Sequence, residues 1–193
     1  MSAKNVEAMW TPWEGRGLEH LRLRVEEGEI DADGVVVGEE DGIVFRTRYV
    51  IRCDPEWRTR EMTVDPLDGR KLLLLRSDGK GNWSDASGQS IPKLKGCTDV
   101  DLSVTPFTNT LPIRRLDLRE GNSSEIVAVY VDIPDMRLET SRQCYTCLER
   151  NADGDLYRYE DEGLFRGFTA DLPVDANGLV LDYPGIFRRV RLD

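Results

Sequence analysis

Apolar and polar side chains alternate with a period of two through most of this chain, and this alternation constrains its fold more than any other feature. Leu21, Leu23 and Val25 alternate with arginines, and the stretch 43–52 repeats the pattern. A period of two gives a strand one apolar and one polar face. Turn pairs separate the runs: Asp33-Gly34, Asp41-Gly42, Asp54-Pro55, Asp68-Gly69, Asp78-Gly79, Ser87-Gly88, Asp153-Gly154 and Asn177-Gly178. The spacing predicts hairpins in a continuous antiparallel meander.

Further strands are expected at 58–63, 71–75, 100–104, 126–133, 142–149, 156–159, 165–172, 179–181 and 186–190. The segment Thr105 to Leu118 contains Pro106 and Pro112, which cannot donate ladder hydrogen bonds, so we predict a short helical or irregular insertion there. No linker divides the 193 residues. A sheet of this many strands curls or closes to protect its edges. We therefore predict a mainly β fold, a large barrel or half-barrel with an internal cavity.

The charge balance disfavours nucleic acid as a partner, because 26 Lys and Arg stand against 36 Asp and Glu, a formal net charge of −10. The first residues lack the apolar run of a secretory signal, and no stretch approaches the length of a transmembrane helix. We therefore expect a cytoplasmic protein without stable membrane insertion. In that compartment its four cysteines would be reduced, and Cys144 and Cys147 lie in a strand-like run rather than in a redox motif.

The sequence lacks the residues that several kinds of catalysis need. His20 is the single histidine, which excludes metal sites and mechanisms that need two imidazoles. There is no nucleophile elbow of the GxSxG type, no phosphate-binding loop and no dinucleotide glycine motif. The segment 151–155 resembles a calcium loop, but the glycine that such a loop needs is absent, so we interpret it as a turn. We expect no metal and no other cofactor.

Arginine dominates the basic residues and recurs on single strand faces: Arg22 and Arg24, then Arg46, Arg48 and Arg52, then Arg58 and Arg60. On the concave side of a curved sheet these faces would form a polar cavity wall paired with Asp99, Asp101 or Glu19. On the convex side they would be solvated charges. Periodicity alone does not choose between the two. Tryptophans near turns could likewise stack on sugar rings or fill the core.

A set of segments carries a family resemblance: 13–15, 17–21, 45–49 leading into Asp54, 81–83, 97–116 and 181–185. The longest reads Cys97-Thr98-Asp99-Val100-Asp101-Leu102 and continues to Leu116. On these residues the chain resembles the bacterial Putative glycolipid-binding family, formerly a domain of unknown function. The resemblance implies one domain, 1–193, folded as a curved, incompletely closed β-barrel similar to those of periplasmic lipoprotein carriers and mycobacterial lipid-binding lipoproteins. A glycolipid ligand follows from that likeness.

Two functions are predicted as alternatives. The first is a cytosolic protein that binds a lipid or glycolipid in the cavity of the sheet and is linked to lipid metabolism. Its candidate ligand-binding residues are Arg48, Arg60, Trp83, Asp99, Asp101 and Asn109. The second is an enzyme of lipid or polyketide metabolism that uses Asp99, Asp101 or His20 as acid or base. A cavity with polar groups only at its mouth favours binding, whereas a buried carboxyl with a raised pKa and a facing donor favours catalysis.

Overall fold

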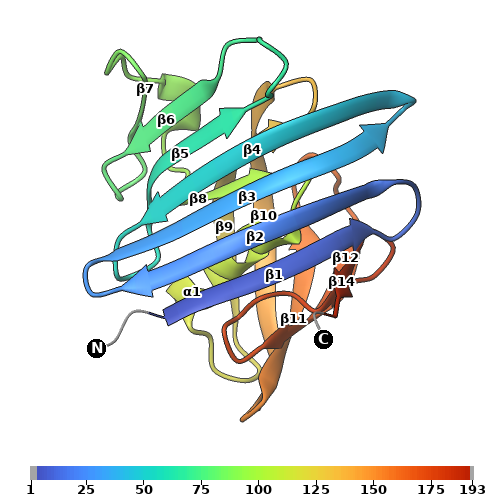
Figure 1. Cartoon of the computed structure of the whole chain (residues 1–193). Coiled ribbons are helices and arrows are strands. Elements are labelled where there is room, and N and C mark those ends of the chain that lie inside the picture. The colour runs from blue at the N-terminus through green and yellow to red at the C-terminus, as the bar shows by residue number, and fades with distance from the viewer. Residues whose placement is uncertain (1–3, 192–193) are drawn as a thin grey trace.

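The computed structural model describes residues 4–191 and is built mainly from two β-sheets (Figure 1). The nine-stranded sheet, called sheet A, has the order β13-β14-β1-β2-β3-β4-β5-β6-β7. Its strands are β1 (Lys4–Pro12), β2 (Gly17–Glu26), β3 (Glu29–Glu40), β4 (Ile43–Cys53), β5 (Thr59–Asp65), β6 (Leu73–Ser77), β7 (Trp83–Asp85), β13 (Asp182–Tyr183) and β14 (Phe187–Val190). Every pair within it is antiparallel, and β1 to β7 form the predicted meander, which is not continuous over the chain because β14 pairs with β1 and β8 to β12 lie in a second sheet.

The five-stranded sheet, called sheet B, has the order β12-β11-β10-β9-β8. Its strands are β8 (Asp99–Leu102), β9 (Ser123–Asp132), β10 (Arg137–Asn151), β11 (Gly154–Asp161) and β12 (Thr169–Asp175). Figure 1 shows sheet A in front with diagonal strands and β9 to β11 behind it, running more steeply. The sheets curve around a shared interior without closing into a barrel, as predicted.

The Pro-containing segment forms the short helical insertion. It consists of a 3₁₀ turn, η2 (Pro106–Asn109), followed by α1 (Thr110–Leu116); a second turn, η1 (Pro92–Leu94), precedes β8. Thr105 caps η2, since its Oγ1 accepts a hydrogen bond from the Phe107 N–H at 3.0 Å. The insertion lies in the connection between β8 and β9, which allows these two strands to pair in parallel. They are the one parallel pair among the strands described.

Two apolar clusters form the core. The larger lies between sheet A and the β8–β9 edge of sheet B, and the smaller lies between sheet B, α1 and β13. The inward positions of β2 illustrate the pattern, because Leu21 and Leu23 are buried whereas Arg22 and Arg24 are exposed. No helix within residues 4–191 has both the length and the apolar character needed to cross a membrane.

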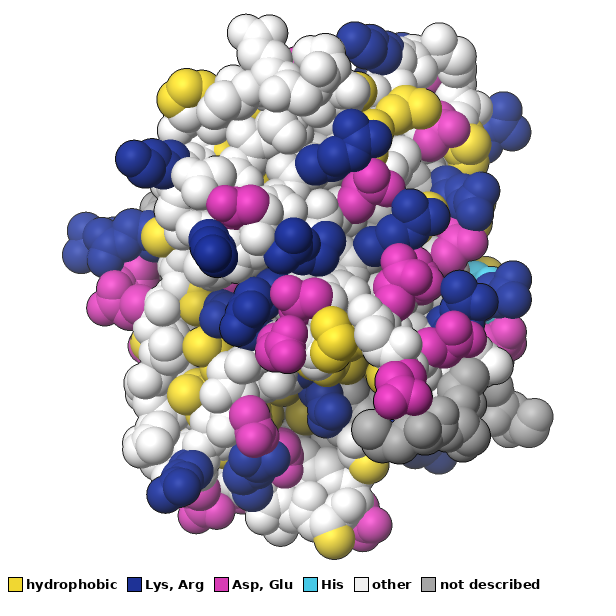
Figure 2. Space-filling view, turned by 90° about the vertical axis from the view of Figure 1, so that its left-hand side faces the viewer, with side chains coloured by type: hydrophobic (Ala, Val, Ile, Leu, Met, Phe, Trp, Pro, Cys, Tyr) yellow, Lys and Arg dark blue, Asp and Glu magenta, His cyan; other side chains and the backbone are white. Residues whose placement is uncertain are grey.

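The arginine-rich faces point to solvent on the outer side of sheet A. Arg24 and Arg52 both bind Asp31, at 3.1 and 3.2 Å, and Arg52 and Arg76 both bind Glu61, at 2.9 and 3.1 Å. These pairs run across neighbouring strands, which explains why the arginines recur at alternate positions. Figure 2 shows a similar interleaving of basic and acidic side chains on an adjacent side of the molecule.

Two sequence predictions about elements were wrong. Asp33-Gly34 is not a turn, because it lies within β3. Gly34 faces the Tyr49 ring on β4, and a Cβ on Gly34 would lie 2.1 Å from a ring carbon, so glycine makes room for an aromatic side chain. The stretch 179–181 is not a strand either; Val180 makes only an isolated bridge to Val174. In addition, β1, β3 and β7 lie where no strand was predicted, and β12 begins at Thr169 rather than at residue 165.

Candidate functional site

A cavity of about 330 Å³ lies where β8, β9 and β11 of sheet B meet the loop 162–168 and the β13–β14 hairpin. We call it the aromatic cavity. Six rings line it: Tyr130, Tyr159, Phe165, Phe168, Tyr183 and Phe187. The polar wall residues are Glu40, Asp101, Ser103, Thr105 and Asn109. Apolar walls with a few converging polar groups are typical of small-molecule sites.

The rings of the aromatic cavity pack against one another. Tyr159 contacts Tyr183 and Phe168 with centroids 6.2 and 6.1 Å apart, and Tyr130 meets Phe165 edge-on at 5.8 Å. Edge-to-face contacts at these distances fix ring orientation. The walls therefore present ring faces and edges in a defined arrangement.

Asp101 is held at both carboxylate oxygens. Its Oδ2 accepts a hydrogen bond from the Gln143 side-chain amide at 2.7 Å, and its Oδ1 accepts one from the Thr108 hydroxyl at 3.1 Å. Burial raises the pKa of Asp101 above its ordinary value, and these two hydrogen bonds oppose the rise. The carboxyl is therefore oriented by its neighbours, and it has no cationic partner among the ion pairs of the described residues.

Asn109, at the end of η2, stands on the same wall. Its Oδ1 accepts a hydrogen bond from the Tyr145 hydroxyl at 2.8 Å, and its Nδ2 donates to the Pro106 carbonyl at 3.1 Å. An asparagine amide offers two donors and two acceptor positions. One N–H donor and one acceptor position of the amide thus remain for a ligand, while the hydrogen bonds with Tyr145 and Pro106 fix the side chain.

Asp161 organises the loop that supplies two of the rings. Its Oδ1 accepts hydrogen bonds from the Gly163 and Phe165 N–H groups at 2.8 and 2.9 Å, and its Oδ2 accepts one from the Tyr159 hydroxyl at 3.1 Å. A carboxylate that accepts successive backbone N–H groups holds a tight loop. Asp161 therefore links the position of Phe165 to that of Tyr159.

A second, smaller cavity of about 180 Å³ adjoins the first, and we call it the inner cavity. The two share four wall residues: Glu40, Ser103, Ile186 and Phe187. The inner cavity is mostly apolar, lined among others by Trp10, Leu18, Val36, Phe45 and Val104. It thus extends the apolar surface available next to the aromatic cavity.

Glu19 is a buried acid on the wall of the inner cavity, 2% exposed. Its Oε1 accepts hydrogen bonds from the Tyr49 hydroxyl and from the Thr105 hydroxyl, the latter at 2.6 Å. Its Oε2 has no hydrogen-bond partner among the described residues. Burial raises the pKa of Glu19 to about 7, although the two hydrogen bonds and the Arg189 charge act in the opposite direction. Thr105 also lines the aromatic cavity, so it joins the two sites.

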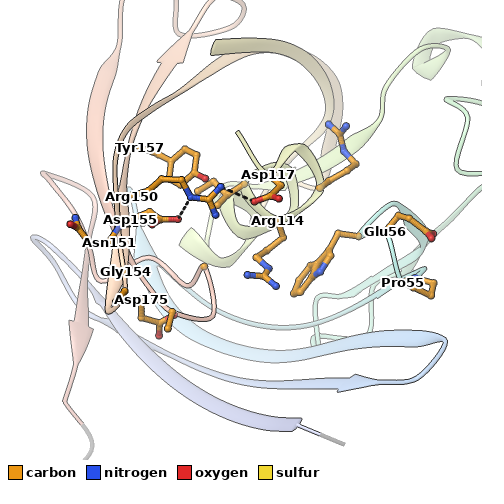
Figure 3. Close-up of a pocket in the computed structure, with 16 residues that line it drawn as sticks. Pro55, Glu56, Arg114, Asp117, Arg150, Asn151, Gly154, Asp155, Tyr157 and Asp175 are labelled. Atoms are coloured by element: carbon orange, nitrogen blue, oxygen red, sulfur yellow. Dashed lines mark hydrogen bonds and ion pairs between the residues drawn. The ribbon is translucent and has the colours of Figure 1, made fainter. Parts of the chain in front are cut away.

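A larger cavity, about 740 Å³, is a polar groove beside α1 (Figure 3). Arg150 lies between Asp117 and Asp155, at 2.9 and 3.6 Å, and the Arg114 guanidinium stands 5.4 Å from the Trp57 ring. Arg150 is thus held by two carboxylates of the groove, and Arg114 is stacked on an aromatic ring. We therefore take the aromatic cavity, not the polar groove, as the candidate site.

The structure brings together two of the six predicted ligand-binding residues, because Asp101 and Asn109 both line the aromatic cavity. The other four lie elsewhere. On the outer face, Arg48 binds Asp33 through two hydrogen bonds of 2.9 and 2.8 Å, and Arg60 is exposed.

Trp83 is buried in the larger core cluster, where its Nε1 donates to the Cys97 carbonyl at 2.9 Å. Asp99 is fully buried and pairs with Arg115 at 2.6 Å. His20, the acid or base of the alternative hypothesis, lies on the outer side of β2, 3.7 Å from Glu7. Of the acids and bases named for that hypothesis, only Asp101 reaches the cavity.

Sequence reasoning named Glu19 only as a possible partner of the strand arginines, not as a site residue in its own right, and it missed the six rings. A signal for Glu19 exists, because it shares the inward face of β2 with Leu21 and Leu23, where an acid is out of place. The rings come from five separate segments, and no local pattern joins them.

No group of three or more His, Cys, Asp or Glu side chains within residues 4–191 is arranged to hold a metal ion. Cys144 and Cys147 both lie in β10, as the sequence predicts. Residues three apart on a strand point to opposite faces, so these thiols do not converge.

Comparison with known proteins agrees with this architecture. The family described as "Putative glycolipid-binding" matches residues 7–189. The crystal structure of a DUF1089 family protein from Pseudomonas aeruginosa superposes with a TM-score of 0.79 at 37% identity, over 92% of this chain and 94% of that one. No curated protein matches the chain significantly. With the match spanning nearly all of the two-sheet fold, the chain belongs to the "Putative glycolipid-binding" family.

Proposed function

We propose that this protein binds a lipid or glycolipid and seats the polar headgroup in the aromatic cavity. The observation that carries the proposal is the joining of six aromatic rings with the oriented side chains of Asp101 and Asn109. Sugar rings stack on aromatic faces, while carboxylate and amide groups bind their hydroxyls. The family description adds support, because it names glycolipid binding.

The size of the cavity suits a headgroup. About 330 Å³ lies at the lower end of the range for small-molecule sites, and the apolar inner cavity next to it offers a wall for the start of an acyl chain.

We further propose that residues 1–193 act as a single domain, in the cytosol and in lipid metabolism. The family match over 7–189 supports one functional unit.

Titration with n-octyl β-D-glucopyranoside below its micelle concentration, followed by calorimetry, tests the proposal. We expect saturable binding that Asp101→Asn weakens by about 1 to 3 kcal/mol, since a hydrogen bond to a charged group is worth about that much. The control is Asp171→Asn, which removes a half-exposed carboxyl paired with Arg158 on β11. Absence of saturable binding, or equal loss in both variants, would contradict a headgroup site at Asp101.

One observation favours the enzymatic alternative, namely that the pKa of Glu19 lies near 7 with the Tyr49 hydroxyl facing it. A general acid or base works best when its pKa is close to the operating pH. Incubation with 4-nitrophenyl β-D-glucopyranoside separates the two functions. A binding protein releases no nitrophenol, whereas turnover that is lost in Glu19→Gln would establish catalysis.

A further inference from the structure

The walls of both cavities carry an excess of acidic groups. Asp101 and Glu40 line the aromatic cavity, and no lysine or arginine of the described residues does so. The inner cavity adds Glu19 and Glu39 against one guanidinium, that of Arg16, whose side chain is exposed. The pair of cavities is therefore negative overall.

Neighbouring cations are engaged elsewhere. Arg189 donates to the Val180 carbonyl at 3.3 Å and stacks 4.7 Å from the Trp10 ring. Arg115 is committed to Asp99, and Arg137 is bound to Asp132 and lies 2.9 Å from Asp135. None of these guanidinium groups lines the aromatic cavity.

Asp101 consequently has no countercharge from the protein, whereas the exposed Glu40 is partly compensated by the charge of Arg137. Burial is the main cause that raises the pKa of Asp101 and of Glu40, and neighbouring acids add to it at both sites. Both oxygens of Asp101 nevertheless accept hydrogen bonds from donors, which is the pattern of an ionised carboxylate. A partly buried carboxylate without a cation, as at Asp101, is a costly arrangement that a positively charged ligand relieves.

On the basis of the proposed function, we infer that the headgroup bound in the aromatic cavity carries an ammonium group, as an amino sugar does. The ammonium supplies the countercharge that Asp101 lacks, and the charge of Glu40 on the same cavity wall adds to the attraction. The surrounding ring faces add attraction, because a cation within about 6 Å of an aromatic centroid is stabilised by the ring quadrupole. Anionic headgroups such as phosphate meet repulsion at the same place.

Two probes that differ in one group test the inference. They are n-octyl 2-amino-2-deoxy-β-D-glucopyranoside, with its amine protonated, and n-octyl β-D-glucopyranoside. We expect the amino sugar to bind roughly tenfold more tightly, with a preference that decreases as salt is added, since charge attraction is screened. Asp101→Asn and, separately, Glu40→Gln should reduce that preference, whereas Asp171→Asn should leave it intact. Two variants are used because either one alone could disturb the wall.

The outcomes distinguish this inference from the proposed function. Equal binding of the two probes by the wild-type protein overturns the ammonium preference and leaves headgroup binding standing. Tighter binding of n-octyl phosphate than of the amino sugar also overturns it. If none of the three probes binds, headgroup binding itself is wrong.

Discussion

Removing the charge of Glu19 should change how the stability of this protein depends on pH. The carboxyl is buried, its Oε1 accepts hydrogen bonds from Tyr49 and Thr105, and its Oε2 has no partner among the described residues. Burial raises its pKa from 4.5 to about 7. The folded state therefore holds the Glu19 proton in a pH range where the unfolded chain has already released it.

The sign and size follow from proton linkage. A carboxyl whose folded pKa is raised contributes stability that is present below the unfolded pKa of 4.5 and is lost as the pH rises towards about 7. Each pKa unit corresponds to about 1.4 kcal/mol, so the full loss between about pH 4.5 and about pH 8 is about 3 kcal/mol. Glu19→Gln keeps the shape and an acceptor oxygen but does not titrate, so it should not show this loss.

Urea denaturation followed by tryptophan fluorescence measures the effect, because Trp10 and Trp83 are buried. Asp101 and Glu40 also have raised pKa values, so the quantity to follow is the difference between wild type and Glu19→Gln at each pH. From about pH 4.5 to about pH 8, the free energy of unfolding of the wild type should fall by about 3 kcal/mol relative to that of Glu19→Gln. Glu149→Gln, at an exposed position, is the control. A difference that stays constant over this range would refute the argument.

Arg115→Met should cost about 3 to 5 kcal/mol in urea denaturation, because it leaves the buried Asp99 carboxylate unpaired; a loss below about 1 kcal/mol would contradict this. Gly34→Ala should lower the free energy of unfolding by about 1 to 3 kcal/mol or more, because the added Cβ overlaps the buried Tyr49 ring; an unchanged melting temperature would argue against the overlap. Arg48→Ala should change stability by less than about 1 kcal/mol and leave n-octyl β-D-glucopyranoside binding unaltered, and altered affinity would place Arg48 in the site.

Local sequence patterns determined much of the architecture. The period of two fixed which side chains of β2 and β4 share a face, and two prolines excluded 105–118 from the ladder. The same reasoning put Asp101 on a strand that ends at the insertion and Asn109 within it, and these two residues do line the aromatic cavity. Such inferences succeed because backbone geometry and missing N–H donors act within a few residues.

Only the tertiary structure decided which faces meet. The arginine faces could have lined a cavity or met solvent, and the packing of sheet A over β8 and β9 turned Arg48 and Arg60 outward. The Asp33-Gly34 pair is typical of a turn, but Gly34 lies within β3, where the Tyr49 ring on the neighbouring strand occupies the space of a side chain. The six rings of the aromatic cavity come from β9, β11, the loop 162–168, β13 and β14, so their convergence depends on contacts between residues far apart in the chain. Periodicity gives each strand two faces, but the long-range packing of the sheets chooses which face is buried.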